Sequence, residues 1–259
     1  MSVDVRRVGS LAETRGVYAD RFLHWQVTSA GFNSAWLGQR AVVIHRMRGT
    51  QPQLIVLGRG PQVTEPLELA AAALPPEQLA DGSVRLTVEV EAAGHLPAGI
   101  RLEAEHTDAW EWMWTQTEPP PVPGEEAVRW TYDMDPVLAL LAHANPRHHG
   151  RPGDPDIRGW AGVFDDGALV CAGALADLDT GAAHLRSITT APRARGQGLG
   201  AAVSAFLTRS ALRSQPPAVT LGLYSDNATA RRLYTRLGFQ PSHALLSGPL
   251  RRSGGSTGR

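Results

Sequence analysis

The feature that most constrains this chain is a glycine-rich turn at residues 195–201, which reads Arg-Gly-Gln-Gly-Leu-Gly-Ala. An apolar, β-branched run at 184–190 precedes the turn, and a run with helical periodicity at 199–212 follows it. A strand that turns through glycines into a helix presents backbone N–H groups and the positive end of a helix dipole to solvent. The sequence therefore predicts an anion site, and the rest of the chain decides which anion it holds.

Two kinds of nucleotide site use similar glycine runs, and the chain excludes the first of them. A Walker-type loop needs a lysine beside its second glycine, whereas this chain contains no lysine and all 25 basic residues are arginine. The dinucleotide pattern G-x-G-x-x-A is matched from Gly196 to Ala201. It expects an acidic residue about 20 positions further on, and residues 214–222 hold none. A dinucleotide site and a turn without a ligand therefore stay open as two interpretations of this glycine run.

A second strand and helix follow the glycine turn. Residues 218–224 have the composition of a short apolar strand, and Asn227 is then placed to cap a helix. Ala230 and Tyr234 continue at helical spacing, and Gly238 marks the end of the helix. Asn227 and Tyr234 are seven residues apart, so they share one helix face at a separation of about 10 Å along the axis.

The two segments together resemble the GNAT acyltransferase superfamily. Its acyl-CoA signature, R/Q-x-x-G-x-G/A, matches the residues from Arg195 to Gly200. Its second signature, N-x-x-A-x-x-x-Y-x-x-x-G-F, matches those from Asn227 to Phe239. The resemblance covers the C-terminal half well and the N-terminal half poorly. It implies an α/β fold with a mixed sheet, preceded by either a degenerate GNAT-like unit or a cap on the C-terminal sheet.

A proline-rich segment divides the chain. Four of the five residues 119–123 are proline, which favours an extended backbone. We therefore expect an N-terminal half at 1–118, a linker at 119–126, a catalytic domain at 127–250 and a flexible tail at 251–259.

Periodicity predicts the elements of the C-terminal half in an order that matches a complete GNAT unit. The predicted strands are 127–133, 157–164, 168–177, 182–190, 218–224 and 239–250. The predicted helices are 135–144, 199–213 and 226–237. Asp165-Asp166-Gly167 predicts a tight hairpin turn between the second and third strands.

The N-terminal half has a less regular pattern. Residues 35–44 and 53–58 look like paired strands, residues 65–79 are helix-like, and residues 84–90 alternate as a strand. Three tryptophans also alternate, which is typical of a packed sheet face: Trp110, Trp112 and Trp114.

Composition bounds the class of protein. With 42% apolar residues the chain can bury a substantial core, and its net charge of zero does not indicate a nucleic-acid surface. Its one cysteine, Cys171, lies in a strand-like run, which favours a packed core thiol and a reducing compartment. No run approaches 18 apolar residues and residues 1–8 lack a signal-peptide core, so we expect a cytoplasmic protein without a membrane span.

The resemblance implies acetyl-CoA as the acyl donor and no metal. Glycines let the backbone approach the pyrophosphate of coenzyme A, and N–H groups at the helix start bind its charge. Arg195 adds a cation in this interpretation, with a solvated surface arginine as the alternative. In the family pattern the pantetheine arm pairs with the preceding strand, and Asn227 hydrogen-bonds the arm or only caps its helix. The expected donor-binding residues are Ile188, Thr189, Thr190, Arg195, Gly196, Gln197, Gly198, Leu199, Gly200, Ala201 and Asn227.

The resemblance also implies two proton-transfer roles. Tyr234 stands at the family's position for the group that serves the departing thiolate, with an ordinary core tyrosine as the alternative. His184 stands eleven residues before Arg195, where some members carry a glutamate base, and histidine titrates near neutral pH. Asp154 and Asp156 are rival bases from the loop before the second strand, and a base acting through water is a further alternative.

These features predict an N-acetyltransferase that transfers the acetyl group of acetyl-CoA to a primary amine by direct attack. The acceptor is an amine-bearing small molecule or peptide that no motif identifies, and the oligomeric state is left open. Two other functions stay open. One is an acyl-CoA sensor without catalysis, and the other is a structural or interaction protein built from two GNAT-like halves.

Overall fold

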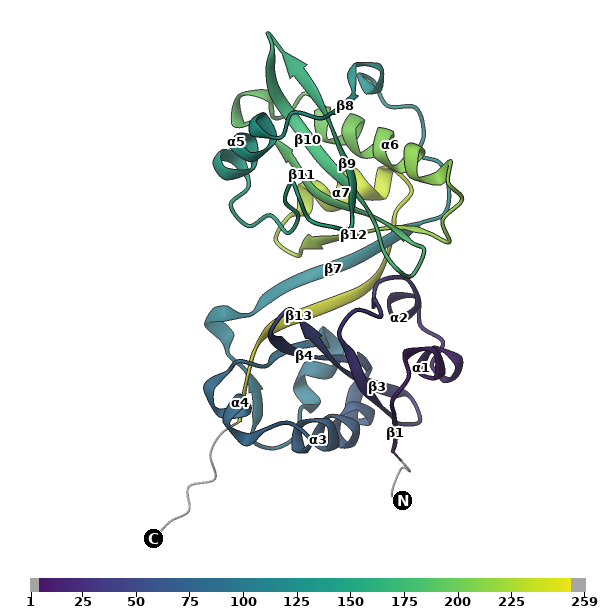
Figure 1. Cartoon of the computed structure of the whole chain (residues 1–259), viewed down its shortest axis with the longest axis vertical. Helices are drawn as coiled ribbons and strands as arrows, with labels where there is room; N and C mark the ends of the chain where they lie inside the picture. The colour runs from purple at the N-terminus through teal and green to yellow at the C-terminus, as the bar shows by residue number, and fades with distance from the viewer. Residues whose placement is uncertain (1–4, 253–259) are drawn as a thin grey trace. The chain divides into compact units, whose positions relative to one another are not determined.

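The computed structural model describes residues 5–252 and divides the chain into two compact units (Figure 1). Each unit combines segments that are far apart in the sequence. Within the described residues, the first unit is built from 5–111, 224–226 and 243–252, and the second from 112–223 and 227–242.

The first unit is organised around a mixed sheet in the order β1-β2-β3-β4-β5-β13, with β6 beside β13. Neighbouring strands are antiparallel except β4 and β5, which are parallel. The strands are β1 (Arg6–Val8), β2 (Phe32–Leu37), β3 (Ala41–Arg48), β4 (Gln51–Gly58), β5 (Arg85–Glu89), β6 (Ile100–Leu102) and the C-terminal part of β13 (Gln240–Arg252). The helices are α1 (Leu11–Val17), α2 (Arg21–Trp25), α3 (Thr64–Ala72) and α4 (Pro76–Asp81).

Two predicted boundaries in the first unit were wrong. Residues 35–44 are not one strand, because the chain turns back after β2 and the Gly38 N–H donates to the Ala41 carbonyl at 2.9 Å. Residues 65–79 are not one helix, because α3 stops before Pro75 and Pro76 begins α4. Proline lacks the N–H that a continuing helix needs.

The second unit has a mixed sheet in the order β7-β12-β11-β10-β9-β8. Strand β10 is antiparallel to both β9 and β11, β8 is antiparallel to β9, and β11 is parallel to β12. The strands are the C-terminal part of β7 (Asp108–Thr115), β8 (Arg129–Thr131), β9 (Ile157–Asp165), β10 (Ala168–Asp177), β11 (Ala183–Thr190) and all but the last residue of β12 (Val219–Tyr224). The helices are α5 (Asp135–Ala144), α6 (Leu199–Leu212) and α7 (Ala228–Arg236).

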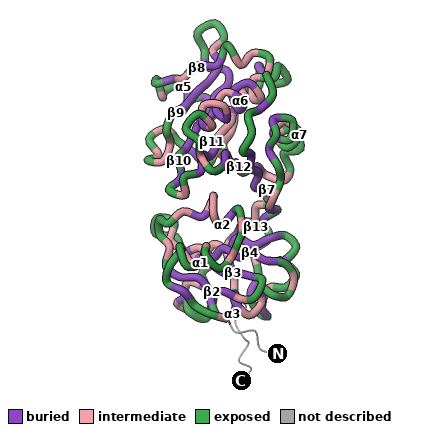
Figure 2. Tube along the Cα trace, turned by 90° about the vertical axis from the view of Figure 1, so that its right-hand side faces the viewer, coloured by how far each residue is buried: buried purple, intermediate pink, exposed green. Residues whose placement is uncertain are grey.

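Helices cover both faces of the second unit's sheet (Figure 1). Leu175 of β10 packs in the core beside α6, whereas its neighbour Ala174 packs in a second core with Leu141 of α5. Successive strand residues point to opposite faces, so α5 and α6 lie on opposite sides. Figure 2 shows buried residues concentrated along the strands and exposed residues on the connecting loops. We refer to these sides as the α5 face and the α6 face.

The proline-rich segment is bound to α6 of the second unit. Arg209 of α6 donates to Glu125 Oε1 at 2.9 Å, to Glu118 Oε2 at 3.0 Å and to the Pro119 carbonyl at 3.1 Å. At the C-terminus, Arg252 ends β13, and the remainder of the expected tail lies outside the described residues.

Candidate active site

The glycine turn adopts the left-handed backbone that favours glycine. Gly196 has φ +80° and Gly198 has φ +81°, and a methyl group added at either would meet nothing within 4 Å. Glycine is therefore favoured at both positions because of the backbone conformation, and not because a larger side chain would clash with its neighbours. A methyl group added at Gly200 would lie 3.6 Å from Leu233 Cδ1 and 3.7 Å from Thr190 Oγ1, so the start of α6 faces both α7 and the end of β11.

Helix α6 begins without a side-chain cap. Its N-cap residue is Gly198, whose carbonyl accepts the N–H groups of Ala201 at 2.9 Å and Ala202 at 3.1 Å. Helix geometry leaves the first N–H groups of a helix without intrahelical acceptors. An anion at this end of α6 would receive those N–H groups and the positive end of the helix dipole.

The parallel strands β11 and β12 are paired along only part of their length. Their register covers three residue pairs and ends at Leu185 opposite Leu221. Strand β11 continues to Thr190 and β12 to Tyr224, and no further pair between these strands occurs within residues 5–252. We call residues 186–190 the open edge of β11, because their side toward β12 is available to a peptide-like partner.

A bulge in β11 changes which side chains face each side of the sheet. Ser187 has φ +54°, and the register with β10 shifts so that β11 holds one extra residue. Arg186 lies opposite Ala174 before the bulge, and Thr189 lies opposite Ala172 beyond it. Positive φ is uncommon for serine, and bulges are frequent beside active sites. The bulge therefore interrupts the regular pairing of β11 with β10 at the start of the open edge.

The loop between α5 and β9 is fastened to this bulge. Asn145 Nδ2 donates to Thr189 Oγ1 at 3.0 Å. Ser187 Oγ accepts the Gly150 N–H and donates to the Gly150 carbonyl, each at 3.0 Å. Sequence analysis did not identify Ser187, because a serine in a strand gives no indication of positive φ.

Tyr234 of α7 is buried, with 8% of its surface exposed. Its ring packs edge-on against Phe239 with the ring centroids 5.7 Å apart. Burial raises the pKa of Tyr234 to about 12, with Cys171 adding to the rise and the Ser204 hydroxyl opposing it. Tyr234 packs in the core on the α6 face, is protonated at neutral pH and can donate a hydrogen bond.

His184 of β11 is also buried, with 9% exposed. Its Nδ1 lies 2.7 Å from Thr220 Oγ1, and the Thr220 hydroxyl donates to the Ala183 carbonyl. Nδ1–H therefore donates to Thr220, which puts the lone pair of the ring on Nε2. Burial lowers the pKa of His184 to about 3, and Arg186 adds to the lowering. The prediction that His184 titrates near neutral pH was therefore wrong, because its buried surroundings lower its pKa.

The two rival aspartates have different partners. Asp156 forms a bidentate pair with Arg186, at 2.9 and 2.6 Å, and Asp154 Oδ2 accepts the Arg151 N–H at 2.9 Å within its own turn. Sequence analysis did not single out Arg186. The available signal was its position two residues after His184, which places both side chains on one face of the strand.

Arg195 and Asn227 are held by local hydrogen bonds. Arg195 donates to the Thr190 and Ala144 carbonyls, both at 3.4 Å, and so links the glycine turn to the ends of β11 and α5. Asn227 Oδ1 accepts the Ala230 N–H at 3.0 Å, which confirms the predicted helix cap. The amide nitrogen of Asn227 is the part of that side chain left to donate to a ligand.

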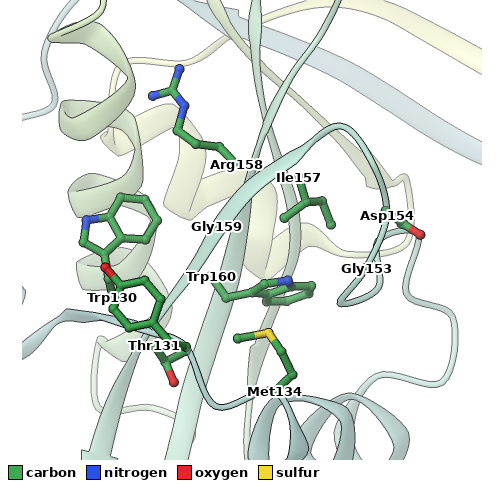
Figure 3. Close-up of a pocket in the computed structure, with 10 residues that line it drawn as sticks. Trp130, Thr131, Met134, Gly153, Asp154, Ile157, Arg158, Gly159 and Trp160 are labelled. Carbon is green, nitrogen blue, oxygen red and sulfur yellow. The ribbon is translucent and has the colours of Figure 1, made fainter.

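A pocket of about 410 Å³ lies beside β8 and the start of β9 (Figure 3). Figure 3 shows the Trp160 indole between the side chains of Ile157 and Met134. Of its residues, Sequence analysis named only Asp154, as a rival base, because the pocket depends on how β8 and β9 pair. The lining residues are Trp130, Thr131, Tyr132, Met134, Gly153, Asp154, Ile157, Arg158, Gly159 and Trp160.

The structure also places the single cysteine. Cys171 is buried, its Sγ lies 3.2 Å from Thr190 Oγ1, and burial raises its pKa to about 11, so the predicted core thiol is confirmed. Residues 5–252 contain no group of three or more His, Cys, Asp or Glu side chains that could hold a metal ion. Over the same residues, no helix has the length and apolar character needed to cross a membrane.

The mixed sheet, the open edge of β11 and the uncapped helix after a glycine turn together define the GNAT acyltransferase fold. The model of the acetyltransferase (GNAT) family matches residues 106–239, more than half of the chain. The chain belongs to this family of acetyltransferases, and the resemblance found in its two signatures is confirmed.

Solved structures have the same fold at low sequence identity. A GCN5-related N-acetyltransferase from Kribbella flavida is 18% identical, with a TM-score of 0.53 over 96% of this chain and 98% of that one. A GCN5-related N-acetyltransferase from Sphaerobacter thermophilus is 16% identical, with a TM-score of 0.53 over 83% of this chain and 80% of that one. At these identities the similarity shows the fold alone.

Proposed function

We propose that the chain is an N-acetyltransferase that moves the acetyl group of acetyl-CoA to a primary amine by direct attack. The open edge of β11 beside the glycine turn carries this proposal. The pantetheine arm of coenzyme A contains amides, which can hydrogen-bond to a strand edge that has no neighbouring strand. The family to which the chain belongs supports this function.

The residues present fit such a donor on three counts. The glycines at 196 and 198 have the backbone that opens the turn, the start of α6 has no side-chain cap, and the open edge begins at a bulge. We infer that the N–H groups of residues 196–201 receive the pyrophosphate, with Arg195 adding positive charge. Residues 188–190 would pair with the arm, and Asn227 would donate to it.

When bound, acetyl-CoA supplies a thioester that an amine can attack with loss of the thiolate. We infer that a backbone N–H at the bulge of β11 polarises the thioester carbonyl, as in other oxyanion sites. Tyr234 would donate a hydrogen bond to the thiolate. Its pKa of about 12 lies above the value near 8.5 of an ordinary thiol, so it stabilises the thiolate without transferring its proton fully.

His184 would act as a neutral acceptor for the attacking amine. The lone pair on Nε2 can receive one N–H of the amine, while the hydrogen bond from Nδ1 to Thr220 holds the ring in place. A conjugate acid with a pKa of about 3 is too strong to form in quantity at neutral pH. The ammonium form of the acceptor therefore loses one proton to water before the attack. The second proton, which the nitrogen loses as the amide forms, also passes to water, and the departing CoA thiolate takes its proton from solvent.

The test is free-thiol release from acetyl-CoA across a panel of primary amines, with mass spectrometry of the acetylated product. We expect equal amounts of thiol and acetylated amine. Thermal stabilisation by acetyl-CoA without thiol release would instead favour the non-catalytic sensor. Absence of any thermal shift at millimolar acetyl-CoA would favour a structural or interaction protein.

A further inference from the structure

The side chain of Ile188 lies at the open edge of β11 and has no part in the reaction described above. Ile188 is half-buried and packs against the core on the α6 face, which also contains Tyr234. The proposed donor would pair with the backbone of Ile188. Its side chain is therefore left to decide how much space remains beside the donor on this face.

The terminal methyl group of Ile188 lies directly over Gly173 of β10. A methyl group added at Gly173 would overlap Ile188 Cδ1, and it would lie 3.2 Å from both Leu207 Cδ1 and Val203 Cγ1 of α6. Gly173 does not have the positive φ that would require a glycine. A glycine inside a strand then indicates that another group approaches closely, and here that group is the end of the Ile188 side chain.

The bulge in β11 accounts for this position of Ile188. The residue pairs on either side of the bulge are offset by one residue, so Gly173 lies opposite two residues of β11, Ser187 and Ile188. Bulges re-aim the side chains beside them. Ile188 Cδ1 lies over β10, in contact with α6, in the space that a side chain at position 173 would otherwise fill.

The proposed donor would place its acyl group beside this side chain. Its pyrophosphate would lie at the start of α6, so the pantetheine arm would run from there along the open edge toward the bulge at Ser187. The thioester carbonyl would accept an N–H at that bulge, and Tyr234 would donate to the sulfur. Because Ile188 and Tyr234 pack in the same core, an acyl chain longer than acetyl would meet the Ile188 side chain.

We propose that Ile188, packed over Gly173, sets the length of the acyl chain that the donor can carry. This inference rests on the proposed function. Ile188 Cδ1 fills the space between β10 and α6 into which a longer chain would extend. The site therefore accepts an acetyl group and excludes longer aliphatic acyl groups, beginning with propionyl.

The test moves one methyl group out of this space and back again. Ile188→Val removes Cδ1 alone, and Gly173→Ala adds a methyl group at the place that Cδ1 leaves. Calorimetric titration of the full chain gives the Kd of acetyl-CoA and of propionyl-CoA. We expect the wild-type protein to bind propionyl-CoA about tenfold more weakly than acetyl-CoA.

Ile188→Val should lower the ratio of the two Kd values by about fourfold or more, since about fourfold is the effect of burying one methylene group. Combining it with Gly173→Ala should restore the wild-type ratio. Ile44→Val makes the same change in a buried strand of the first unit and is the matched control, which should leave the ratio unchanged. If the double variant does not fold, the comparison of Ile188→Val with Ile44→Val decides the outcome alone.

Because these titrations measure binding, they separate this inference from the proposed function. If the ratio changes as expected but no amine is acetylated, the role of Ile188 stands and the acetyltransferase proposal fails. If amines are acetylated and Ile188→Val changes the ratio no more than Ile44→Val does, Ile188 is a packing residue only, and the acetyltransferase proposal stands. Equal Kd values of the two donors in the wild-type protein, or no binding of either, would also overturn the role of Ile188.

Discussion

Tyr234 lies on the α6 face with Ala183 and Leu185, so His184, which stands between these two strand residues, lies on the α5 face. Burial favours the uncharged form of both side chains. It raises the pKa of Tyr234 to about 12 and lowers that of His184 to about 3. Neither side chain changes charge near neutral pH. We therefore expect that the pH dependence of kcat/KM shows no titration of His184 near pH 6.5. The fall in kcat/KM at acidic pH should instead follow the pKa of the amine that is used as acceptor. A limb that stays near pH 6.5 for amines of different pKa would contradict this assignment.

The charge state of His184 also predicts a pH-dependent stability. An unfolded histidine titrates near pH 6.5 and the folded one near 3, so the unfolded state binds more protons between these values. The stabilisation is present above pH 6.5 and is lost as the pH falls toward 3. His184→Asn cannot titrate, and its amide can still donate to Thr220. We expect the Tm of the wild-type protein to fall more steeply than that of His184→Asn between pH 6.5 and 4; parallel curves would count against a buried neutral histidine.

Tyr234→Phe tests the hydrogen bond to the thiolate. The substitution removes the hydroxyl and keeps the ring that packs on Phe239. We expect kcat to fall roughly 100-fold, in the range typical of a positioned acid–base group, while the calorimetric Kd for acetyl-CoA changes by less than about threefold. Tyr18→Phe in the first unit is the control. Turnover equal to that of the wild-type protein would remove Tyr234 from the proposed role.

At the scale of elements, local signals predicted the second unit well. Helix α5 begins and ends at the residues predicted from its Asp-Pro start and its periodicity. Helix α7 begins after Asn227 and ends before Gly238, as predicted. The hairpin turn between β9 and β10 has Asp166 and Gly167 at positive φ, as its sequence predicted. These features depend on neighbouring residues, which is why sequence alone could predict them.

Features that depend on distant pairing could not be predicted in the same way. The open edge follows from where the register of β11 and β12 ends, and the Ser187 bulge follows from the register of β11 with β10. The pocket beside β8 and the start of β9 depends on how β8 pairs with β9. Sequence analysis therefore predicted the glycine turn, Tyr234 and His184 as candidates, but not Arg186, Ser187 or Trp160.

Gly198→Ala tests the role of the glycine turn that leads into α6. Because Gly198 has φ +81°, an alanine there is strained by about 1–2 kcal/mol. We expect chemical denaturation to show a loss of that size, and we expect the Kd for acetyl-CoA to rise about tenfold as the turn shifts. Gly16→Ala in α1 lacks a positive φ and meets nothing within 4 Å, so it should not destabilise the protein. Equal effects of the two substitutions would contradict the conformational role of Gly198.

At the scale of the whole molecule, the two units have matching topologies. Strands β1-β2-β3-β4-β5 occupy one sheet in the order that β8-β9-β10-β11-β12 occupy in the other, and the last two strands of each set are parallel. The connection between that parallel pair is helical in both units, with α3 and α4 in one and α6 in the other. This correspondence favours a second GNAT-like unit over a simple cap for the N-terminal half.

The first unit lacks the features on which the proposed donor site of the second unit rests. Strands β4 and β5 pair over four residues, as far as Val56 opposite Val88, so β4 extends only two residues beyond the last pair, to Gly58, whereas β11 extends five. Pro61 then lies in the turn that follows β4 and has no N–H to offer an anion. We therefore expect only the second unit to bind acetyl-CoA.

Calorimetric titration of the full chain with acetyl-CoA tests most directly whether the glycine turn and the open edge of β11 hold the donor. We expect one acetyl-CoA per chain, with affinity weakened about tenfold by Gly198→Ala. Gly60 has φ +64° in the corresponding turn of the first unit, so Gly60→Ala introduces similar strain and should leave the affinity unchanged. Two molecules per chain, no binding, or equal weakening by both substitutions would contradict a donor site in the second unit.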